Sequence, residues 1–317
     1  MSPATLDLFI LLLIFSIVTV GLDLVIGYTK IFSVNQALLF GVGAFSYAYC
    51  VNFLGTASLL IAWAIAVPVS AVISAAIGLA SLRVHGDYFI VASFGAQIIG
   101  IQALFNWFSL TGGSTGAYGL PFPTIFGWVP DTQNAYLLLV GVIAVAVYVV
   151  VALLLLSPWG RLVRALGEDQ PALAAAGFDP RRLQVVAFVL GGSLAAMAGP
   201  LYAGYLGIAQ INDYSLNVSI SLLAMVILGG AGHVVGGLIG AAVFVAIPYW
   251  LDRTSLSSTT SGQIKQAIFG ALLLVIVMFM PSGVTGLWTK LSELRTRKRP
   301  LVSGATPSAA ESVGPPE

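Results

Sequence analysis

Long apolar runs constrain the fold of this chain more than any other feature. The stretch AYLLLVGVIAVAVYVVVALLLL (Ala135–Leu156), for example, contains no charged residue. A bilayer core about 30 Å thick needs roughly 20 apolar residues per helical crossing, and the backbone must satisfy its own hydrogen bonds in lipid. Because the runs have helical length, and 58% of the 317 residues are hydrophobic against 8% charged, the sequence predicts an all-α, polytopic transmembrane helical bundle.

Nine spans are expected, within a range of eight to ten. They are Leu6–Ile26, Val34–Leu54, Ala57–Leu82, Tyr88–Trp107, Ala135–Leu156, Gln184–Ile208, Leu216–Gly230, Val235–Leu251 and Ile264–Met280. The segment after Lys30 and the pair of spans around Gly232 are alternatively re-entrant. The amino terminus has Asp7 where a signal peptide carries lysine, and no small-residue cleavage site follows, so the first span is expected to stay uncleaved.

Basic residues orient the chain, because cytoplasmic loops of membrane proteins are enriched in Lys and Arg. With nine spans, one side receives Lys30, Arg83, Arg161, Arg164, Arg181, Arg182, Lys290, Arg295, Arg297, Lys298 and Arg299. Only Arg253 and Lys265 fall on the other side. Residues 1–290 therefore form a transmembrane domain with an outer amino terminus. Residues 291–317 form a basic, then disordered, cytoplasmic tail. The outer connection Ser109–Asn134 is either a structured lip or a mobile loop.

The sequence lacks the signatures of common catalytic and metal sites. Cys50 is the only cysteine, and neither His85 nor His233 has a Cys, His or carboxylate at metal-ligand spacing. No GxxxxGK[ST], GxSxG or HExxH motif is present. A net charge of +1 indicates no nucleic-acid partner. We expect a transport protein rather than an enzyme, without a metal or cofactor of its own, and any ATP that drives it to be held by another subunit.

Two sets of residues within the spans are candidates for packing and transport. Small residues at every fourth position predict close helix packing; they are Gly191, Ala195, Gly199, Ala203 and Gly207, and then Gly232, Gly236 and Gly240. Candidate pathway residues for a polar solute are Tyr28, Asn35, Gln36, Ser93 and Gln97. For the neutral side chains among them, hydrogen bonds between helices are the alternative. Asp23 is expected to pair with Lys30 or to stay near the headgroups.

One basic stretch, residues 157–183, interrupts the apolar sequence and predicts a docking surface for a soluble partner. Its candidate interface residues are Arg161, Arg164, Ala165, Glu168, Asp169, Ala174, Ala175 and Gly177. Arg164 and Glu168 are spaced i, i+4, so a short helix would present a charged face. Gly177 would end that helix and turn the chain toward the next span. The alternative is a basic loop that only anchors the chain at the membrane.

Five segments in order carry a resemblance to a known family. They are GLDLVIGYTKIFSVNQALLFGVGAF (Gly21–Phe45), LRVHGDYFIVASFG (Leu82–Gly95), LTGGSTGAYGLP (Leu110–Pro121), the stretch Ser157–Phe188, and LLAMVILGGAGHVVGGLIGA (Leu222–Ala241). Over about Gly21–Trp288 the chain resembles membrane-spanning permease subunits of ABC importers for branched-chain amino acids. The resemblance implies a bacterial inner-membrane protein that pairs with a homologous permease or, as the alternative, with a second copy of itself. It also implies two cytoplasmic ATPase subunits that hold the ATP, a solute-binding protein outside, and a coupling helix within residues 157–183.

The chain departs from the usual pattern of this family at three positions. Members commonly have glycine at the position of Lys30, a histidine near Gln36, and glutamate where Gln97 stands. Relatives of similar sequence move urea or short amides, so the solute stays open. An ion-coupled secondary transporter and a passive channel for a small neutral solute are the alternative functions.

Overall fold

The computed structural model describes residues 3–83, 87–253 and 270. The α-helices are α1 (Pro3–Thr29), α2 (Gln36–Leu54), α3 (Leu59–Ser81), α4 (Asp87–Asn106), α5 (Phe108–Thr111), α6 (Gln133–Leu156), α7 (Pro158–Glu168), α8 (Gln170–Ala175), α9 (Pro180–Leu206), α10 (Leu216–Gly229) and α11 (Gly236–Arg253). A 3₁₀ helix, η1, covers Ile211–Tyr214, and two short strands are β1 (Ala117–Tyr118) and β2 (Ile208–Ala209).

The predicted polytopic helical bundle is confirmed. Within the described residues, α1, α2, α3, α4, α6 and α9 are long and apolar enough to cross a membrane, and α10 and the first part of α11 are shorter apolar helices. Eight of the nine predicted spans therefore coincide with helices, whereas the ninth, Ile264–Met280, and the tail 291–317 lie outside the described residues. The boundary of α9 differs most: it starts at Pro180, because the Asp179 carboxylate accepts a hydrogen bond from the Arg181 N–H (3.0 Å) and caps the helix.

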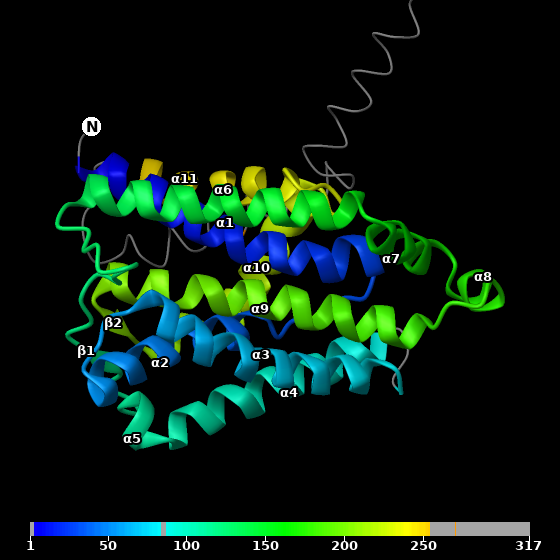
Figure 1. Cartoon of the computed structure of the whole chain (residues 1–317), viewed down its shortest axis with the longest axis horizontal. Helices are drawn as coiled ribbons and strands as arrows, with labels where there is room; N and C mark the ends of the chain where they lie inside the picture. Colours follow the sequence, from blue (N-terminus) through cyan, green and yellow to red (C-terminus); the bar gives the residue numbers. More distant parts are fainter. Residues whose placement is uncertain (1–2, 84–86, 254–269, 271–317) are drawn as a thin grey trace, which may run out of the picture.

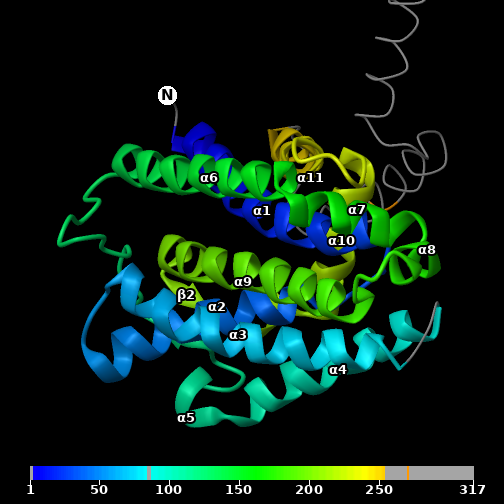
Figure 2. The ribbon, with the colours of Figure 1, turned by 45° about the vertical axis from the view of Figure 1, so that its right-hand side comes forward.

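The long helices run lengthwise, and the two ends of the bundle differ (Figures 1 and 2). One end carries α7 and α8, with α8 standing clear of the other helices; we call it the α8 end. The opposite, β1–β2 end is closed by the antiparallel pairing of Ala117 with Ala209 and of Tyr118 with Ile208. The Thr124 N–H also donates to the Ala57 carbonyl (2.8 Å). These bonds make the 109–134 connection a structured lip, the first of its two predicted alternatives.

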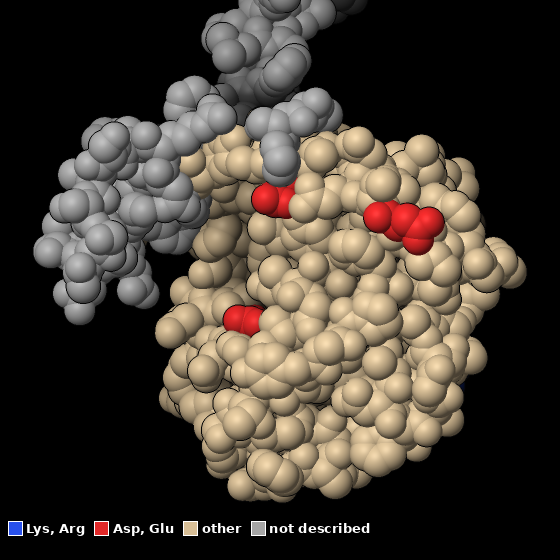
Figure 3. Space-filling view, turned by 90° about the vertical axis from the view of Figure 1, so that its left-hand side faces the viewer, with Lys and Arg blue, Asp and Glu red and all other residues tan. Residues whose placement is uncertain are grey.

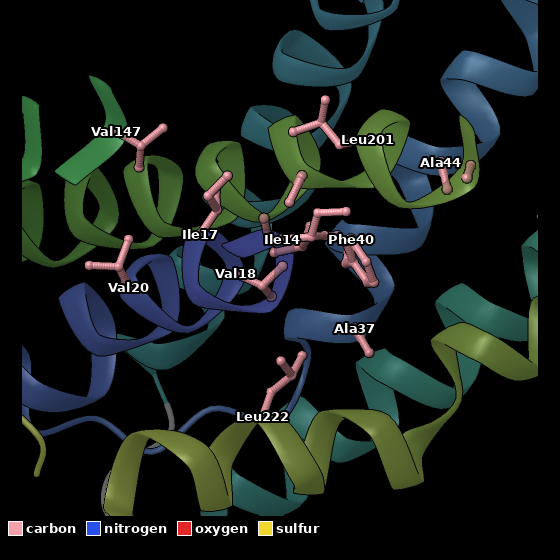
Figure 4. Packing of buried hydrophobic residues seen from close by; sticks show 14 of the residues in the cluster. Ile14, Ile17, Val18, Val20, Ala37, Phe40, Ala44, Val147, Leu201 and Leu222 are labelled. Atoms are coloured by element: carbon pink, nitrogen blue, oxygen red, sulfur yellow. The ribbon is translucent and has the colours of Figure 1, made fainter. Parts of the chain in front are cut away.

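The core is built around α1. Ile10, Ile14 and Ile17 of this helix are fully buried, and Figure 4 shows their cluster meeting Phe40 of α2 and Leu201 of α9. Lipid is as apolar as these side chains, so their burial adds little to helix association in a membrane. Close contact between backbones is needed as well.

Small residues bring α2 and α9 into that contact. A Cβ atom added at Gly199 would lie under 3.0 Å from the Ala44 nitrogen and the Phe40 carbonyl oxygen, and one at Gly43 would meet the Ala196 carbonyl equally closely. Gly191 lies against the Gly21 carbonyl of α1 in the same way, and Ala195 and Ala203 of the same stripe are fully buried. The stripe therefore lies within the packed faces of α9, where small side chains allow close approach.

Three of the predicted packing glycines have other positions. Gly207, with φ +70°, lies beyond α9 and ends it in the left-handed conformation that glycine favours, so its assignment to the packing stripe is wrong. Gly232, with φ +87°, lies in the turn between α10 and α11 rather than on a helix. Gly236 is the first residue of α11 and packs against the Gly230 carbonyl. Gly240, inside α11, packs against the Met225 carbonyl of α10.

Candidate functional site

The chain enters α2 from inside the bundle. After α1 ends at Thr29, residues 30–35 carry no regular secondary structure, and Ser33 to Gln36 are buried. The Gln36 side-chain amide donates to the Gly191 carbonyl of α9 (3.0 Å) and, more weakly, to the Val18 carbonyl (3.5 Å) near the middle of α1. The first turn of α2 thus begins deep between other helices. Free N–H groups at such a start need partners, because lipid and apolar side chains supply none.

Polar side chains from two other helices, α4 and α10, supply those partners. The Ser93 hydroxyl accepts from the Val34 N–H (3.2 Å), and the Gln97 side-chain oxygen accepts from the Leu38 N–H (3.0 Å), both from α4. The Ser219 hydroxyl of α10 accepts from the Ala37 N–H (3.1 Å). The Gln97 amide nitrogen then donates to the Tyr214 carbonyl (3.0 Å). We call this set, residues 33–38 with Ser93, Gln97, Gly191, Tyr214 and Ser219, the α2-start cluster.

The α2-start cluster contains four of the five candidate pathway residues: Asn35, Gln36, Ser93 and Gln97. Three of them, Gln36, Ser93 and Gln97, hydrogen-bond the backbone of neighbouring helices or of the α2 entry, which is the alternative role expected from the sequence. Asn35 accepts from the Ser33 hydroxyl, while its amide nitrogen has no partner among the described residues. Sequence reasoning missed Ser219, since one serine in an apolar run carries no signal of its partner.

The fifth candidate, Tyr28, lies apart from that cluster. It is buried at the α8 end of α1, where the Arg164 guanidinium of α7 stands over its ring, 5.6 Å from the centroid. A Cβ atom at Gly167 would collide with the Tyr28 carbonyl oxygen. Glycine at 167 therefore lets α7 seat directly on the last turn of α1, and cation–π attraction holds Arg164 there.

The segment 157–183 forms two helices, where the sequence predicted one. The chain breaks at Asp169, whose carboxylate accepts from the Ala172 N–H (2.9 Å) and caps α8. Gly177, with φ +87°, lies just past α8 and turns the chain back toward α9, as its residue type predicted.

Some side chains of this segment are buried and attach it to the rest of the protein, whereas others are exposed. Val163, Leu166 and Leu173 are buried, and Ala165 is half-buried. The exposed residues include Arg161, Arg164, Glu168, Asp169, Ala172, Ala174, Ala175, Gly177 and Phe178. Among the described residues the one ion pair is Arg182 with Asp179 (3.4 Å), so Arg164 packs on Tyr28 rather than pairing with Glu168. The exposed surface of α8 is therefore mainly apolar, and charged residues of α7 and of the α7–α8 junction surround it.

Lys30 adopts a backbone conformation that suits glycine. Its φ of +56° is left-handed, which costs a residue with a Cβ roughly 1–2 kcal/mol. We predict that Lys30→Gly raises the free energy of unfolding by about 1 kcal/mol, because glycine removes this strain. Thermal melting of the purified protein in detergent measures the gain. Lys30→Ala, which removes the charge and keeps the strain, is the control and should give no gain; equal stabilisation by both variants would contradict the strain argument.

Asp23 does not pair with Lys30, which is exposed, so the first of its two sequence expectations is wrong. Its carboxyl is buried against the turn between α10 and α11, within the last two turns of α1. One carboxylate oxygen accepts a hydrogen bond from the Gly232 N–H (2.8 Å), and the other has no partner in the described part of the chain. Within that same part, no group of three or more His, Cys, Asp or Glu side chains is arranged to hold a metal ion.

Residues 4–277 match the sequence model of a family described as the permease component of the branched-chain amino acid transport system. The chain belongs to this family. It is accordingly a multi-pass membrane protein that acts as a permease component of an ABC transport system. It is not itself an ATPase, because in such systems ATP is bound by separate ATPase subunits.

Known relatives agree with the family match. The chain is 26% identical over 310 residues to the high-affinity branched-chain amino acid transport system permease protein LivM of Escherichia coli K12, a match covering 89% of this chain and 70% of LivM. LivM of Salmonella typhimurium is equally similar over the same shares. LivH of Salmonella typhimurium is 26% identical over 208 residues, 62% of this chain and 63% of LivH. No solved structure matches the chain significantly.

Proposed function

We propose that this chain is one half of a permease pair in a bacterial inner-membrane importer, and that its cargo is branched-chain amino acids. It pairs with a homologous permease, binds two cytoplasmic ATPase subunits through α7 and α8, and receives solute from an extracytoplasmic binding protein. ATP-driven closure of the ATPases moves α8 and α7, and the helices switch between outward-open and inward-open arrangements. The family match and the exposed α8 carry this proposal.

The distribution of charge supports a cytoplasmic α8 end and a cytoplasmic carboxyl terminus. Described basic residues at or beside the helix ends of this side are Lys30, Arg83, Arg161, Arg164, Arg181 and Arg182. On the opposite, β1–β2 end, the part of the surface that Figure 3 draws in colour shows acidic residues and no Lys or Arg, and Arg253, the last residue of α11, is the described basic residue on that side. That asymmetry is the one the positive-inside rule expects.

The shape of α8 supports its role as the coupling element. Leu173 anchors α8 to the protein, while Ala174, Ala175 and Phe178 face outward. Small exposed residues let a helix enter a cleft of a partner, and the charged residues at its rim can fix its orientation there. Asp169 alone separates α8 from α7 and caps α8, so a push on α8 passes directly into α7.

The relatives' names and the features of the β1–β2 end support the choice of cargo and its delivery. LivM and LivH are named for branched-chain amino acid transport. At the β1–β2 end, a recess of about 500 Å³ lies between the lip and the end of α9, lined in part by Phe122, Asp131 and Tyr205. A docked binding protein would release its solute on this side. Calorimetry of that protein with leucine, isoleucine, valine and urea tests the cargo, and heat with urea alone would contradict it.

Substitution on α8 tests the coupling role. We expect Ala174→Arg to lower ATP-driven uptake at least tenfold in vesicles holding the complete importer, because a long charged side chain cannot enter a cleft shaped for alanine. Ala174→Ser keeps the side chain small and is the matched control. Normal uptake by Ala174→Arg would contradict coupling through α8. Accumulation of leucine by the chain alone, driven by an ion gradient, would favour the secondary-transporter alternative.

A further inference from the structure

Two elements pack against the α8 end of α1, on different sides of the helix. On one side α7 sits on it, with Arg164 over the Tyr28 ring at 5.6 Å and Gly167 against the Tyr28 carbonyl. On the other side lies the turn between α10 and α11, residues 230–235. Both contacts fall within the last two turns of α1, so one short piece of helix separates the coupling segment from that turn.

The contact with the turn is made by backbone and by one buried carboxylate. Asp23 accepts the Gly232 N–H at 2.8 Å and is only 2% exposed. A Cβ atom at Gly27 would collide with the Gly232 nitrogen, so the turn lies flush on α1. Ala231, His233 and Val235 are exposed, whereas Val234 is half-buried and packs against the core, so the Asp23 hydrogen bond and Val234 together attach the turn.

A buried carboxylate in this place is costly. Its second oxygen has no hydrogen-bond partner in the described residues, and a buried polar group without a partner is expensive in a membrane span. An alanine or leucine would avoid that cost but would leave the Gly232 N–H unpaired. The Asp23 side chain is therefore better explained by its hydrogen bond to the Gly232 N–H than by a contribution to packing.

We propose that the end of α1 is a connector that carries a displacement of α7 to the α10–α11 turn, with Asp23 as the positioning residue that holds the turn to α1. This inference rests on the proposed importer function. An α-helix is stiff over two turns, and contacts between backbones without intervening side chains leave no slack. A movement of α7 at Tyr28 therefore moves Gly232 as well. Ser219, in the first turn of α10, belongs to the α2-start cluster. A displacement of α10 and α11 therefore reaches the interior of the bundle.

Hydrogen exchange on the chain alone tests the attachment. Asp23→Ala should speed amide exchange in residues 230–235 about tenfold or more, because it removes the hydrogen bond that the Gly232 N–H donates to the Asp23 carboxyl. Asp23→Asn should exchange like the wild type, since its amide oxygen still accepts from Gly232. Thr19→Val is the matched control: it removes another α1–α11 hydrogen bond, from the Thr19 hydroxyl to the Gly237 carbonyl (3.1 Å), farther from α7. Unchanged exchange in Asp23→Ala would overturn the attachment.

Transport by the complete importer tests the connector. We expect Asp23→Ala to keep ATP hydrolysis and to lower leucine uptake per ATP about tenfold, with Asp23→Asn and Thr19→Val close to wild type. Failure of Asp23→Asn together with Asp23→Ala would overturn the positioning role, and so would normal uptake per ATP in Asp23→Ala. Should the wild-type assembly show no ATP-dependent uptake at all, the importer function fails, whereas the exchange result on the isolated chain still reports on the attachment.

Discussion

Replacing Gly199 by valine is expected to abolish the folded state of most of the purified protein. The added Cβ alone would lie under 3.0 Å from backbone atoms of Phe40 and Ala44, which cannot rotate away as a side chain can. Overpacking a core commonly costs about 1–3 kcal/mol, and forcing two helix backbones apart belongs at the upper end or beyond. Size-exclusion chromatography and thermal melting in detergent measure the loss.

Gly95→Val is the matched control for Gly199→Val. A Cβ at Gly95 of α4 meets no atom within 4 Å, so the same substitution in another spanning helix should leave melting nearly unchanged. Equal destabilisation by the two variants would mean that valine in a span is harmful for reasons other than the α2–α9 contact. A folded Gly199→Val protein would contradict the close packing itself.

Gln97→Leu is expected to destabilise the protein by several kcal/mol. The substitution leaves the Leu38 N–H and the Tyr214 carbonyl without partners in a fully buried site. Each unpaired buried group costs about 1–3 kcal/mol. Because both groups belong to the α2-start cluster, uptake should fall with stability. Denaturant or thermal unfolding of the purified protein measures the effect.

Gln102→Leu provides the comparison within the same helix. Gln102 lies five residues farther along α4 and is exposed, so its removal leaves no buried group of the described residues unpaired. We expect little change in unfolding. If Gln97→Leu were as stable as Gln102→Leu, the hydrogen bonds of Gln97 would not be what holds the start of α2.

Span positions followed from sequence because hydrophobic length is a local property. Eight predicted spans coincide with helices, and the turn at Gly177 was predicted from its residue type. Gly207 shows the limit of periodicity: it continues the four-residue spacing from Gly191, yet α9 ends one residue earlier. Spacing alone does not reveal where a helix stops.

The partners of buried polar groups could not be predicted, because they depend on contacts between distant segments. Asp23 was placed relative to the end of its own helix, whereas its partner, Gly232, lies 209 residues away. The run Val34–Leu54 likewise reads as an ordinary span. Nothing local distinguishes a helix that starts at the surface from one that starts between other helices.

The interior start of α2 has a consequence for biogenesis. Residues 34–38 depend on Ser93 and Gln97, 59 residues away in each bonded pair, and on Ser219, 182 residues beyond Ala37. The ribosome synthesises these donors and acceptors one after another. The start of α2 therefore cannot reach its final depth in the bundle until α10 has been synthesised. Newly synthesised protein truncated before residue 219 should therefore hold its second hydrophobic segment in an unfinished, hydrated position that only later synthesis corrects.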